Sequence, residues 1–141
     1  MDDLKNASHR VSVKIICIAK SKVLLIKAKW KETFNLIGGW VDKWENLEKT
    51  IIREFEEETW NKRNGNYNLK LVHCENIQFP EWWQFDAVLN IFYLMKFENT
   101  FNVKLEDIYE KFWRFSVEEL GNLKISQHSN KLLILDILQK K

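Results

Sequence analysis

Residues 38–61 read GGWVDKWENLEKTIIREFEEETWN, and the rest of the chain is organised around this stretch. The segment 47–59 has the pattern of a helix, with bulky apolar residues on one arc that would face a core. At 100° per residue, Glu54, Glu57 and Glu58 stand three and four positions apart, so their carboxylates share one helix face. The stretch therefore predicts an amphipathic helix that carries three neighbouring acids.

Such a group of carboxylates indicates a bound cation. Like charges four residues apart on a helix repel by about 0.2–0.5 kcal/mol, so a surface helix normally intersperses its charges. A hard divalent ion with oxygen ligands offsets this repulsion, and Mg2+ is the natural choice. We therefore expect Mg2+, or Mn2+ in its place, as the cofactor. A solvated acidic helix after a Gly-Gly turn is the alternative interpretation.

The spacing of these charges resembles the Nudix box, G-x5-E-x7-R-E-U-x-E-E-x-G-U, where U is a bulky apolar residue. Seven positions are in register, namely Gly39, Glu45, Arg53, Glu54, Phe55, Glu57 and Glu58. Two positions depart from the box, because Trp60 stands at its glycine and Asn61 at its last apolar residue. The box covers residues 39–61 only, and the chain around it also suits the family.

The resemblance implies a hydrolase that cleaves the phosphoanhydride bond of a nucleoside diphosphate linked to another group. Nucleoside triphosphates, ADP-ribose and nucleotide sugars are all possible substrates. By resemblance, the metal ligands are Gly38 through its carbonyl, Glu54, Glu57 and Glu58, and the catalytic residues are Arg53, Glu54 and Glu57. Glu54 is alternatively the base that deprotonates the attacking water.

The resemblance also gives supporting roles to Glu45 and Gly39. Arg53 is expected to pair with Glu45, since an arginine–carboxylate fork supplies both charge and fixed geometry. The alternative for Arg53 is a surface pair with Glu57 four residues on, worth only about 0.2–0.5 kcal/mol.

Residues outside the box are less clearly assigned. Glu98 and Glu106 are candidates for a base from outside the box, and each is alternatively a solvated loop acid. Aromatic rings that could stack on a nucleobase are Phe34, Trp82, Trp83 and Phe85. Ordinary core or loop packing is the alternative for these rings.

The rest of the chain predicts strands on both sides of the acidic helix and a further helix near the C-terminus. Strands are expected at 11–19, 23–26, 36–37, 69–77, 85–97 and 112–115, and helices at 47–59, 116–120 and 129–139. We therefore predict an α/β protein, a Nudix-type α/β/α sandwich with a mixed β-sheet between helices. Residues 1–141 would form a single domain, with a loose tail at 1–8.

Composition bounds the partners and the compartment. A net charge of +2 over 141 residues is too small to indicate nucleic acid or a membrane as the main partner. We expect a small-molecule nucleotide as the ligand and a monomer or homodimer as the assembly. Cys17 and Cys74 lack metal-ligand spacing, so we expect both as reduced core thiols of a cytoplasmic protein. The first ten residues have no signal-peptide character.

Glycine is scarce and tryptophan abundant. The chain has 4 Gly, against roughly ten at average usage, and 7 Trp. Trp44 and Trp60 stand where the family often has glycine, so one hypothesis is that these codons are opal codons translated under the wrong genetic code. A divergent natural sequence is the alternative. We expect Trp60 to make the helix end at a neighbour such as Asn61 or continue past it, since left-handed helix ends favour glycine. A catalytically inactive Nudix domain that binds a nucleotide as a sensor also stays open.

Overall fold

The computed structural model describes residues 7–62, 67–105 and 107–140. Within these ranges the elements are β1 (His9–Ala19), β2 (Lys22–Ala28), β3 (Ile37–Trp40), α1 (Leu47–Thr59), β4 (Leu69–Gln78), β5 (Ala87–Phe97), β6 (Tyr109–Phe115), α2 (Val117–Leu120), a 3-10 turn (Gln127–Ser129) and α3 (Lys131–Gln139). Helix α1 has the predicted bounds, and every predicted strand is present within a few residues of its expected position. None of the helices in the described ranges has the length and apolar character needed to cross a bilayer.

The strands form one mixed sheet in the order β4-β5-β1-β2-β6, with β3 as an additional partner of β1. β1 and β5 run parallel along their whole length, whereas every other pairing is antiparallel. The first half of β1, at 12–15, pairs with β3, and its end at Ile18 and Ala19 pairs with β2. The sheet therefore opens between β3 and β2, which leaves one edge of β3 facing α1.

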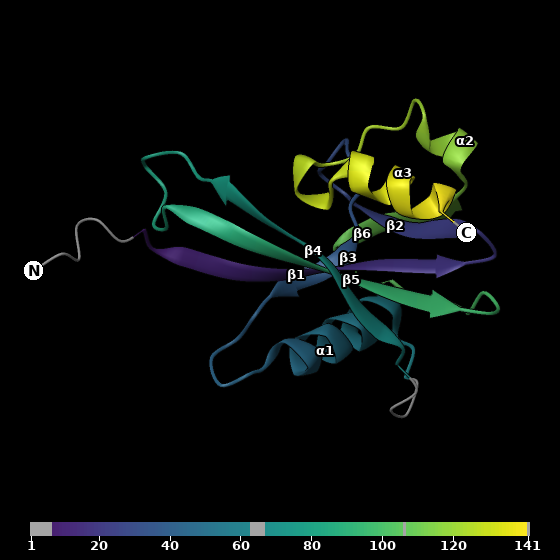
Figure 1. The fold of residues 1–141 in the computed structure, drawn as a ribbon, viewed down its shortest axis with the longest axis horizontal. Helices are drawn as coiled ribbons and strands as arrows, with labels where there is room; N and C mark the ends of the chain where they lie inside the picture. The colour runs from purple at the N-terminus through teal and green to yellow at the C-terminus, as the bar shows by residue number, and fades with distance from the viewer. Residues whose placement is uncertain (1–6, 63–66, 106, 141) are drawn as a thin grey trace, which may run out of the picture.

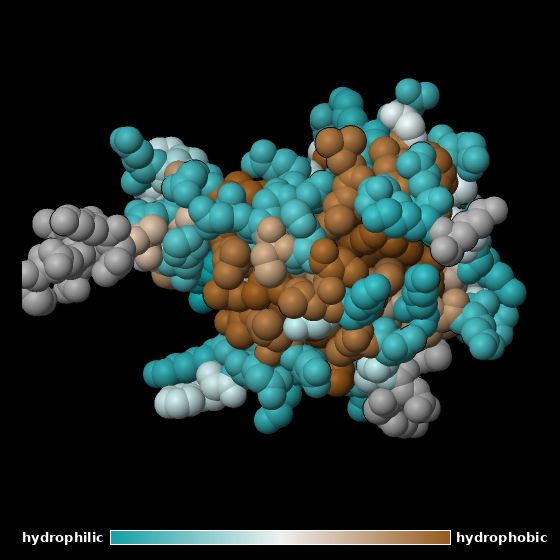
Figure 2. All heavy atoms as spheres, viewed as in Figure 1, coloured by the Kyte–Doolittle hydropathy of each residue, from teal (hydrophilic) through white to brown (hydrophobic). Residues whose placement is uncertain are grey.

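Helices cover both faces of the sheet, so the predicted α/β/α sandwich is confirmed. In Figure 1, α1 lies on one side of the strands, and α2 and α3 lie on the other. Ile51 and Phe55 of α1 are fully buried against Ile15 of β1 and its neighbours. On the opposite face, Ile134 of α3 and Leu120 of α2 close a second cluster. Figure 2 shows apolar side chains gathered in the centre of the molecule, between the regions where α1 and α3 lie in Figure 1.

Local signals in the sequence account for the shorter helices. The predicted capping box is present, because the Ser116 hydroxyl accepts from the Glu119 N–H and the Glu119 carboxylate accepts from the Ser116 N–H. Helix α3 begins at Lys131, two residues later than predicted. Asn130 adopts a left-handed conformation and its side chain accepts from the Leu133 N–H, which fixes the start of the helix there.

Two expectations about the chain need correction or restriction. The prediction that both cysteines are core thiols is wrong for Cys74, which is exposed on the edge strand β4, whereas Cys17 is buried as expected. Residues 1–6 of the expected loose tail lie outside the described residues. At the end of that tail, the Ser8 N–H donates to Asp86 at 2.8 Å.

Candidate active site

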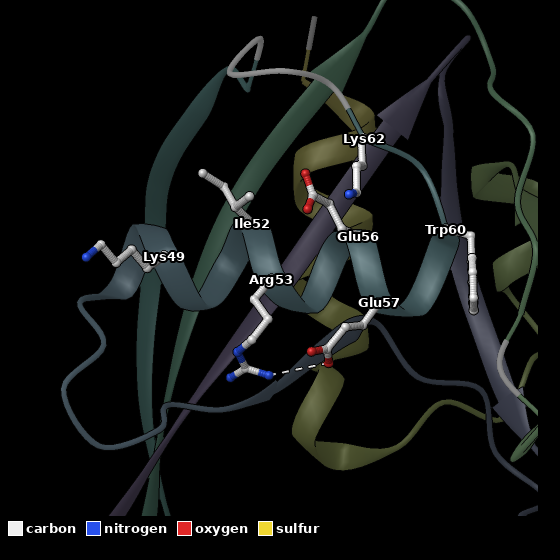
Figure 3. Close-up of a pocket in the computed structure, with 7 residues that line it drawn as sticks. All are labelled: Lys49, Ile52, Arg53, Glu56, Glu57, Trp60 and Lys62. Atoms are coloured by element: carbon white, nitrogen blue, oxygen red, sulfur yellow. Dashed lines mark hydrogen bonds and ion pairs between the residues drawn. The ribbon is translucent and has the colours of Figure 1, made fainter.

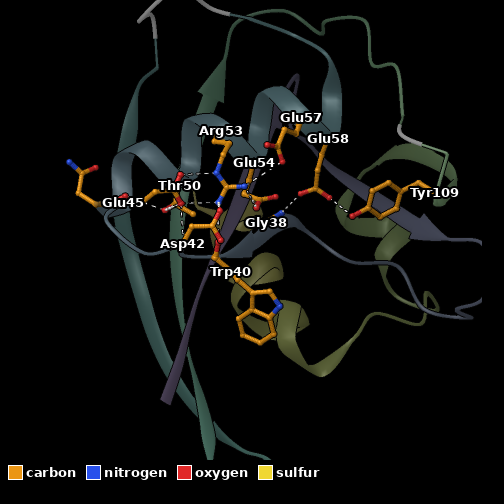
Figure 4. Close-up of polar contacts among 11 residues, drawn as sticks. Gly38, Trp40, Asp42, Glu45, Thr50, Arg53, Glu54, Glu57, Glu58 and Tyr109 are labelled. Carbon is orange, nitrogen blue, oxygen red and sulfur yellow. Dashed lines mark hydrogen bonds and ion pairs between the residues drawn. The ribbon is translucent and has the colours of Figure 1, made fainter. Parts of the chain in front are cut away.

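Helix α1 presents its polar side chains beside β3 because a side-chain cap fixes where the helix begins and two buried residues fix which side of it faces the core. Asn46 caps the helix, accepting from the Lys49 N–H at 2.9 Å. Ile51 and Phe55 then anchor one side of the helix in the core. The acidic side chains lie on the adjoining arc, where they reach the open edge of β3 (Figure 4).

The two glycines of β3 are required by close approach. A Cβ atom on Gly39 would lie 2.4 Å from the carboxyl carbon of Glu54, and one on Gly38 would lie 2.1 Å from the Val13 carbonyl oxygen. Neither position therefore admits a side chain without movement of its neighbours. This gap in the side chains of β3 is where the Glu54 carboxylate sits.

Arg53 organises the acids around it (Figure 4). Its Nε donates to Glu45 Oε2 at 2.7 Å and its Nη2 to Glu45 Oε1 at 2.8 Å, so the predicted fork is present. Its Nη1 lies 2.8 Å from Glu54 Oε1 and 3.4 Å from Glu57 Oε2. Nη2 also donates to the Trp40 carbonyl at 3.1 Å. The contact with Glu57 that the alternative interpretation expected is thus present, but it is the longest of the hydrogen bonds that Arg53 makes in this network.

Glu58 is held separately from the other acids. It is 3% exposed, and it accepts from the Gly38 N–H at 2.8 Å and from the Tyr109 hydroxyl. The Gly38 N–H points away from β1, and so does the neighbouring Trp40 carbonyl that binds Arg53. Gly38 is therefore a non-hydrogen-bonded position of the antiparallel pair, and its carbonyl faces the same open edge. That direction is the one its predicted role as a ligand requires.

The surroundings of these acids shift their pKa values in opposite directions. Burial raises the pKa of Glu58 to about 8 and that of Glu54 to about 7, in both cases against the favourable contacts that these groups make. The hydrogen bonds from Arg53 lower the pKa of Glu45 to about 2. Glu45 is thus fully balanced by Arg53, whereas the ionised forms of Glu54 and Glu58 lack enough positive charge.

A divalent cation fits this deficit. In the described part of the chain, no group of three or more His, Cys, Asp or Glu side chains is close enough to hold an ion as the side chains lie. Arg53 draws Glu54 and Glu57 to itself, while Tyr109 and Gly38 hold Glu58. The donors along this helix face are nevertheless all oxygens, as Mg2+ and Mn2+ prefer. Burial raises the pKa values of Glu54 and Glu58, so added positive charge would stabilise the ionised forms of these two acids.

A cavity of about 320 Å3 lies on the opposite face of the sheet and reaches the same glycine. Its lining residues are Ser12, Lys14, Lys31, Thr33, Asn35, Gly39, Trp40, Phe79, Val88, Asn90, Ser126 and His128. The lining contains two lysines and no acid. The Asn90 Nδ2 lies 3.1 Å from His128 Nδ1, and its buried Oδ1 has no hydrogen-bond partner among the described residues. The cavity therefore combines positive charge with amide and hydroxyl groups, which suits an anionic, polar ligand.

Of the aromatic candidates, Phe34 is in the wrong place for its expected role. It is buried and packs edge-on against Phe115 in the core, because the 31–35 loop folds inward between β2 and Ile125. Trp82 and Trp83 lie in the exposed loop after β4. The guanidinium of Arg10 lies over the rings of both Phe85, at 5.6 Å, and Trp40, at 4.8 Å from the centroid. Trp40 lines the cavity, whereas none of the four candidate rings does.

Of the two proposed bases outside the box, Glu98 does not join these acids in the described part of the chain. Glu98 follows β5 and is exposed, and nothing in its described contacts brings it to the acids of α1. Glu106 lies outside the described residues. Within the described ranges, the box alone supplies the acids of this site.

Sequence reasoning missed several residues of the site. Tyr109, Lys14 and Asn90 were given no role in the site, and His128, which lacks ligand-like spacing, was interpreted as an ordinary core or surface histidine. Each reaches the site from a strand or loop far from the box, so no local spacing could reveal it. The aromatic residue that begins β6, at Tyr109, is the one weak signal, since it extends the strand pattern of 112–115 toward the N-terminus.

A second hollow, of about 600 Å3, runs along the outer surface of α1 (Figure 3). Its lining residues are Lys49, Ile52, Arg53, Glu56, Glu57, Trp60 and Lys62. The expectation that Trp60 would shift the end of α1 to a neighbour such as Asn61, or extend the helix past it, is wrong. The helix ends at Thr59, and Trp60 itself takes the left-handed conformation, with φ 56° and its N–H donating to the Glu56 carbonyl at 2.8 Å. Capping that carbonyl satisfies the helix end, although the backbone conformation disfavours any side chain.

The chain matches one protein-family model and resembles several solved structures. The family model described as NUDIX domain matches residues 8–135. The structure resembles the Escherichia coli dihydroneopterin triphosphate pyrophosphohydrolase, with a TM-score of 0.78, 13% identity and coverage of 91% of this chain and 94% of that chain. It also resembles the NUDIX domain of Shewanella oneidensis NrtR complexed with ADP ribose, with a TM-score of 0.72, 13% identity and coverage of 96% and 90%.

A third similar structure is the MutT protein from Methanosarcina mazei Go1, with a TM-score of 0.69, 19% identity and coverage of 96% of this chain and 99% of that chain. No curated protein matches the sequence. At these identities the solved structures establish a shared fold, and the family model establishes the kind of domain.

Proposed function

This chain belongs to the Nudix family and is a Nudix hydrolase, and we propose that it cleaves the phosphoanhydride bond of a nucleotide with the help of Mg2+. The substrate class is a nucleoside diphosphate linked to another group, such as a nucleoside triphosphate, ADP-ribose or a nucleotide sugar. We further propose that residues 1–141 form one domain and that Mn2+ can replace Mg2+.

One observation carries this proposal. The under-neutralised acids of α1 and the lysine-lined cavity meet at Gly39, where a side chain is excluded by the Glu54 carboxylate. A nucleotide with its nucleoside in the cavity would place its phosphates across Gly39, next to the acids. Negative phosphates beside negative acids require cations between them, so substrate and metal would bind together.

Each residue of the box then has a separable role. Glu57 and Glu58, with the Gly38 carbonyl, would hold the cation, which would supply positive charge to neutralise the phosphate oxygens. Arg53 fixes Glu45 and orients Glu54 and Glu57 through its Nη1. Glu54 serves either as a further ligand or as the base that takes a proton from the attacking water. Its position in the Gly39 gap suits both roles.

The cavity accounts for recognition of the nucleoside. Lys14 and Lys31 supply positive charge toward the phosphates. Trp40 and Phe79 offer the aromatic faces on which a base can stack. Its volume of about 320 Å3 suits a base with part of its sugar rather than a whole dinucleotide. A substrate would therefore extend out of the cavity along β3.

A substrate screen tests this proposal. The protein is incubated with Mg2+ and each member of a panel of nucleoside triphosphates, ADP-ribose and nucleotide sugars, and product phosphate is measured after treatment with a phosphatase. The matched control is Glu57→Gln. Metal-dependent release that this variant lacks is the expected result. Release at an equal rate by the variant would contradict the assignment.

The role of Glu54 is settled by the same assay together with thermal unfolding. If Glu54 is the base, Glu54→Gln keeps the rise in Tm caused by Mg2+ and loses turnover. If Glu54 is a ligand, the variant loses both, because a cation that binds only the folded state stabilises it by mass action.

The alternative function is a catalytically inactive domain that binds a nucleotide as a sensor. The observation that favours it is that Arg53 engages Glu54 and Glu57 at once, so that within the described ranges these acids do not converge on one point with Glu58. A nucleotide that raises Tm but is not cleaved in the presence of either metal would support this alternative.

A further inference from the structure

The tryptophans of this chain lie in positions that are unusually exposed for this residue type. All seven are exposed, with fractional exposures from 41% for Trp40 to 90% for Trp44. Tryptophan is normally highly buried on average, because its large ring gains most from removal from water. Here both core clusters close around aliphatic and phenylalanine side chains, without a single tryptophan. Their placement resembles that of a small surface residue.

Two of the seven also occupy a backbone conformation that is disfavoured for any side chain. Trp44 has φ 72° and Trp60 has φ 56°. The other non-glycine residues with positive φ in the described ranges have recognisable reasons. Lys20 and Ser21 form the tight turn between β1 and β2, and Asn130 caps α3 with its side chain.

The rings of Trp44 and Trp60 supply no comparable reason. Trp44 lies under the Lys43 ammonium at 5.4 Å and Trp60 under the Lys104 ammonium at 5.1 Å. Exposed contacts of this kind are weak, and each ring is mostly in solvent. Glycine would adopt both backbone conformations without steric cost.

We propose that the protein made by its source organism carries glycine at positions 44 and 60. The opal codon UGA is read as glycine in some genetic codes and as tryptophan in others, so translation under the wrong code would place tryptophan at each position that UGA encodes. Positive φ and high exposure at Trp44 and Trp60, together with 4 Gly beside 7 Trp in the chain, agree with this origin at these two positions. The inference does not rest on the proposed hydrolysis.

The exchange has consequences for the site. Position 44 immediately precedes Glu45, the partner of Arg53, and position 60 ends the helix that carries the acids. Trp60 also forms one end of the hollow along α1 in Figure 3. With glycine at 60, this end of the hollow would lose its wall.

The codons and the natural protein test the origin directly. The expected result is UGA at both positions in the gene, and peptides from protein isolated from the source cells whose masses fit glycine at 44 and 60. UGG at either position, or a natural peptide with tryptophan there, would overturn the proposal.

The Tm of variants tests whether the backbone at positions 44 and 60 favours glycine, and alanine is the matched control. Trp60→Gly and Trp60→Ala both remove the ring, but only glycine relieves the left-handed backbone. The Gly variant should therefore melt roughly 3 to 6 °C above the Ala variant, and the same order should hold at position 44. At Trp113, in the extended strand β6, glycine should instead melt below alanine. An Ala variant as stable as the Gly variant at 44 and 60 would contradict the proposal.

Discussion

The two sides of β3 carry buried groups of opposite charge, acids on one side and a lysine on the other. On the α1 side, Glu54 and Glu58 are buried acids whose pKa values are raised by burial. On the α3 side, burial lowers the pKa of Lys14, although Glu58 and Glu54 oppose this shift. The α1 side lacks positive charge to balance its buried acids, and the α3 side lacks negative charge to balance its lysine. Gly38 and Gly39 of β3 lie between the two sides. A metal ion answers the first need and a polyphosphate the second.

This difference predicts that the two sides control different kinetic quantities. Groups on the α1 side would act on charge that develops during reaction, and so set kcat. Groups on the α3 side would act on the bound nucleotide before reaction, and so set KM. Variants that change one quantity but not the other therefore test the division.

The largest effect is expected for Glu57→Gln. The side chain is half exposed, and the polar partner that it has among the described residues is Arg53, at 3.4 Å, so the fold and the Tm should change little. Turnover should fall by at least about 100-fold, since an interaction with charge developing in the transition state is removed. The measurement is kcat with saturating Mg2+. Glu48→Gln, an exposed acid in the first turn of the same helix, is the control and should keep its activity.

A smaller effect on the same side is expected for Tyr109→Phe. The hydroxyl donates to Glu58 Oε2, and its loss should weaken Mg2+ binding about 10-fold, as is typical for a group that orients a metal ligand. The measurement is the Mg2+ concentration that gives half-maximal activity. Tyr67→Phe removes a similar hydroxyl from Glu56, outside the site, and is the matched control. An unchanged Mg2+ requirement would show that Tyr109 has no positioning role.

On the other side, Lys14→Met should raise KM about 10-fold while kcat changes less, because a cation that binds the ground state and transition state equally is removed. Burial disfavours the charge of Lys14, so the Tm of the nucleotide-free protein should not fall. Lys70→Met, an exposed lysine on β4, is the control. A large loss of kcat with unchanged KM would end the proposed division between the two sides.

The sequence predicted the acidic side far better than the basic side. Helix α1 and the Arg53–Glu45 pair follow from spacing within one segment, where helix geometry relates each residue to the next. Lys14 and Asn90 meet only because β1 and β5 pair in parallel, which no local pattern specifies. Phe34 was misplaced for the same reason, since its burial depends on contact with Phe115 on another strand.

Trp60 is a different kind of failure. Local propensity predicted that a tryptophan would displace the helix end, yet the Glu56 carbonyl still receives its cap from the Trp60 N–H. The backbone at this position thus stays left-handed although tryptophan occupies it. That is the behaviour expected of a position built for glycine.

The smallest predicted effect concerns pH. In the folded, metal-free protein the pKa of Glu58 is about 8, against an ordinary value of 4.5. Above pH 4.5 the unfolded chain loses this proton while the folded protein keeps it. The stability contributed by the protonated acid is therefore complete below pH 4.5 and is lost as pH rises through 8.

The Tm of the metal-free protein should consequently fall by about 4 °C between about pH 7 and pH 9. His128 and Lys14, whose pKa values are lowered by burial, act in the opposite direction, so the informative quantity is the difference between wild type and Glu58→Gln. Glutamine cannot ionise, and the variant should lack this part of the decline. The rise in Tm caused by Mg2+ should be larger at the higher pH, because the cation binds the ionised acids. Identical pH profiles for wild type and variant would mean that the acidic side carries no unbalanced charge for a metal to neutralise.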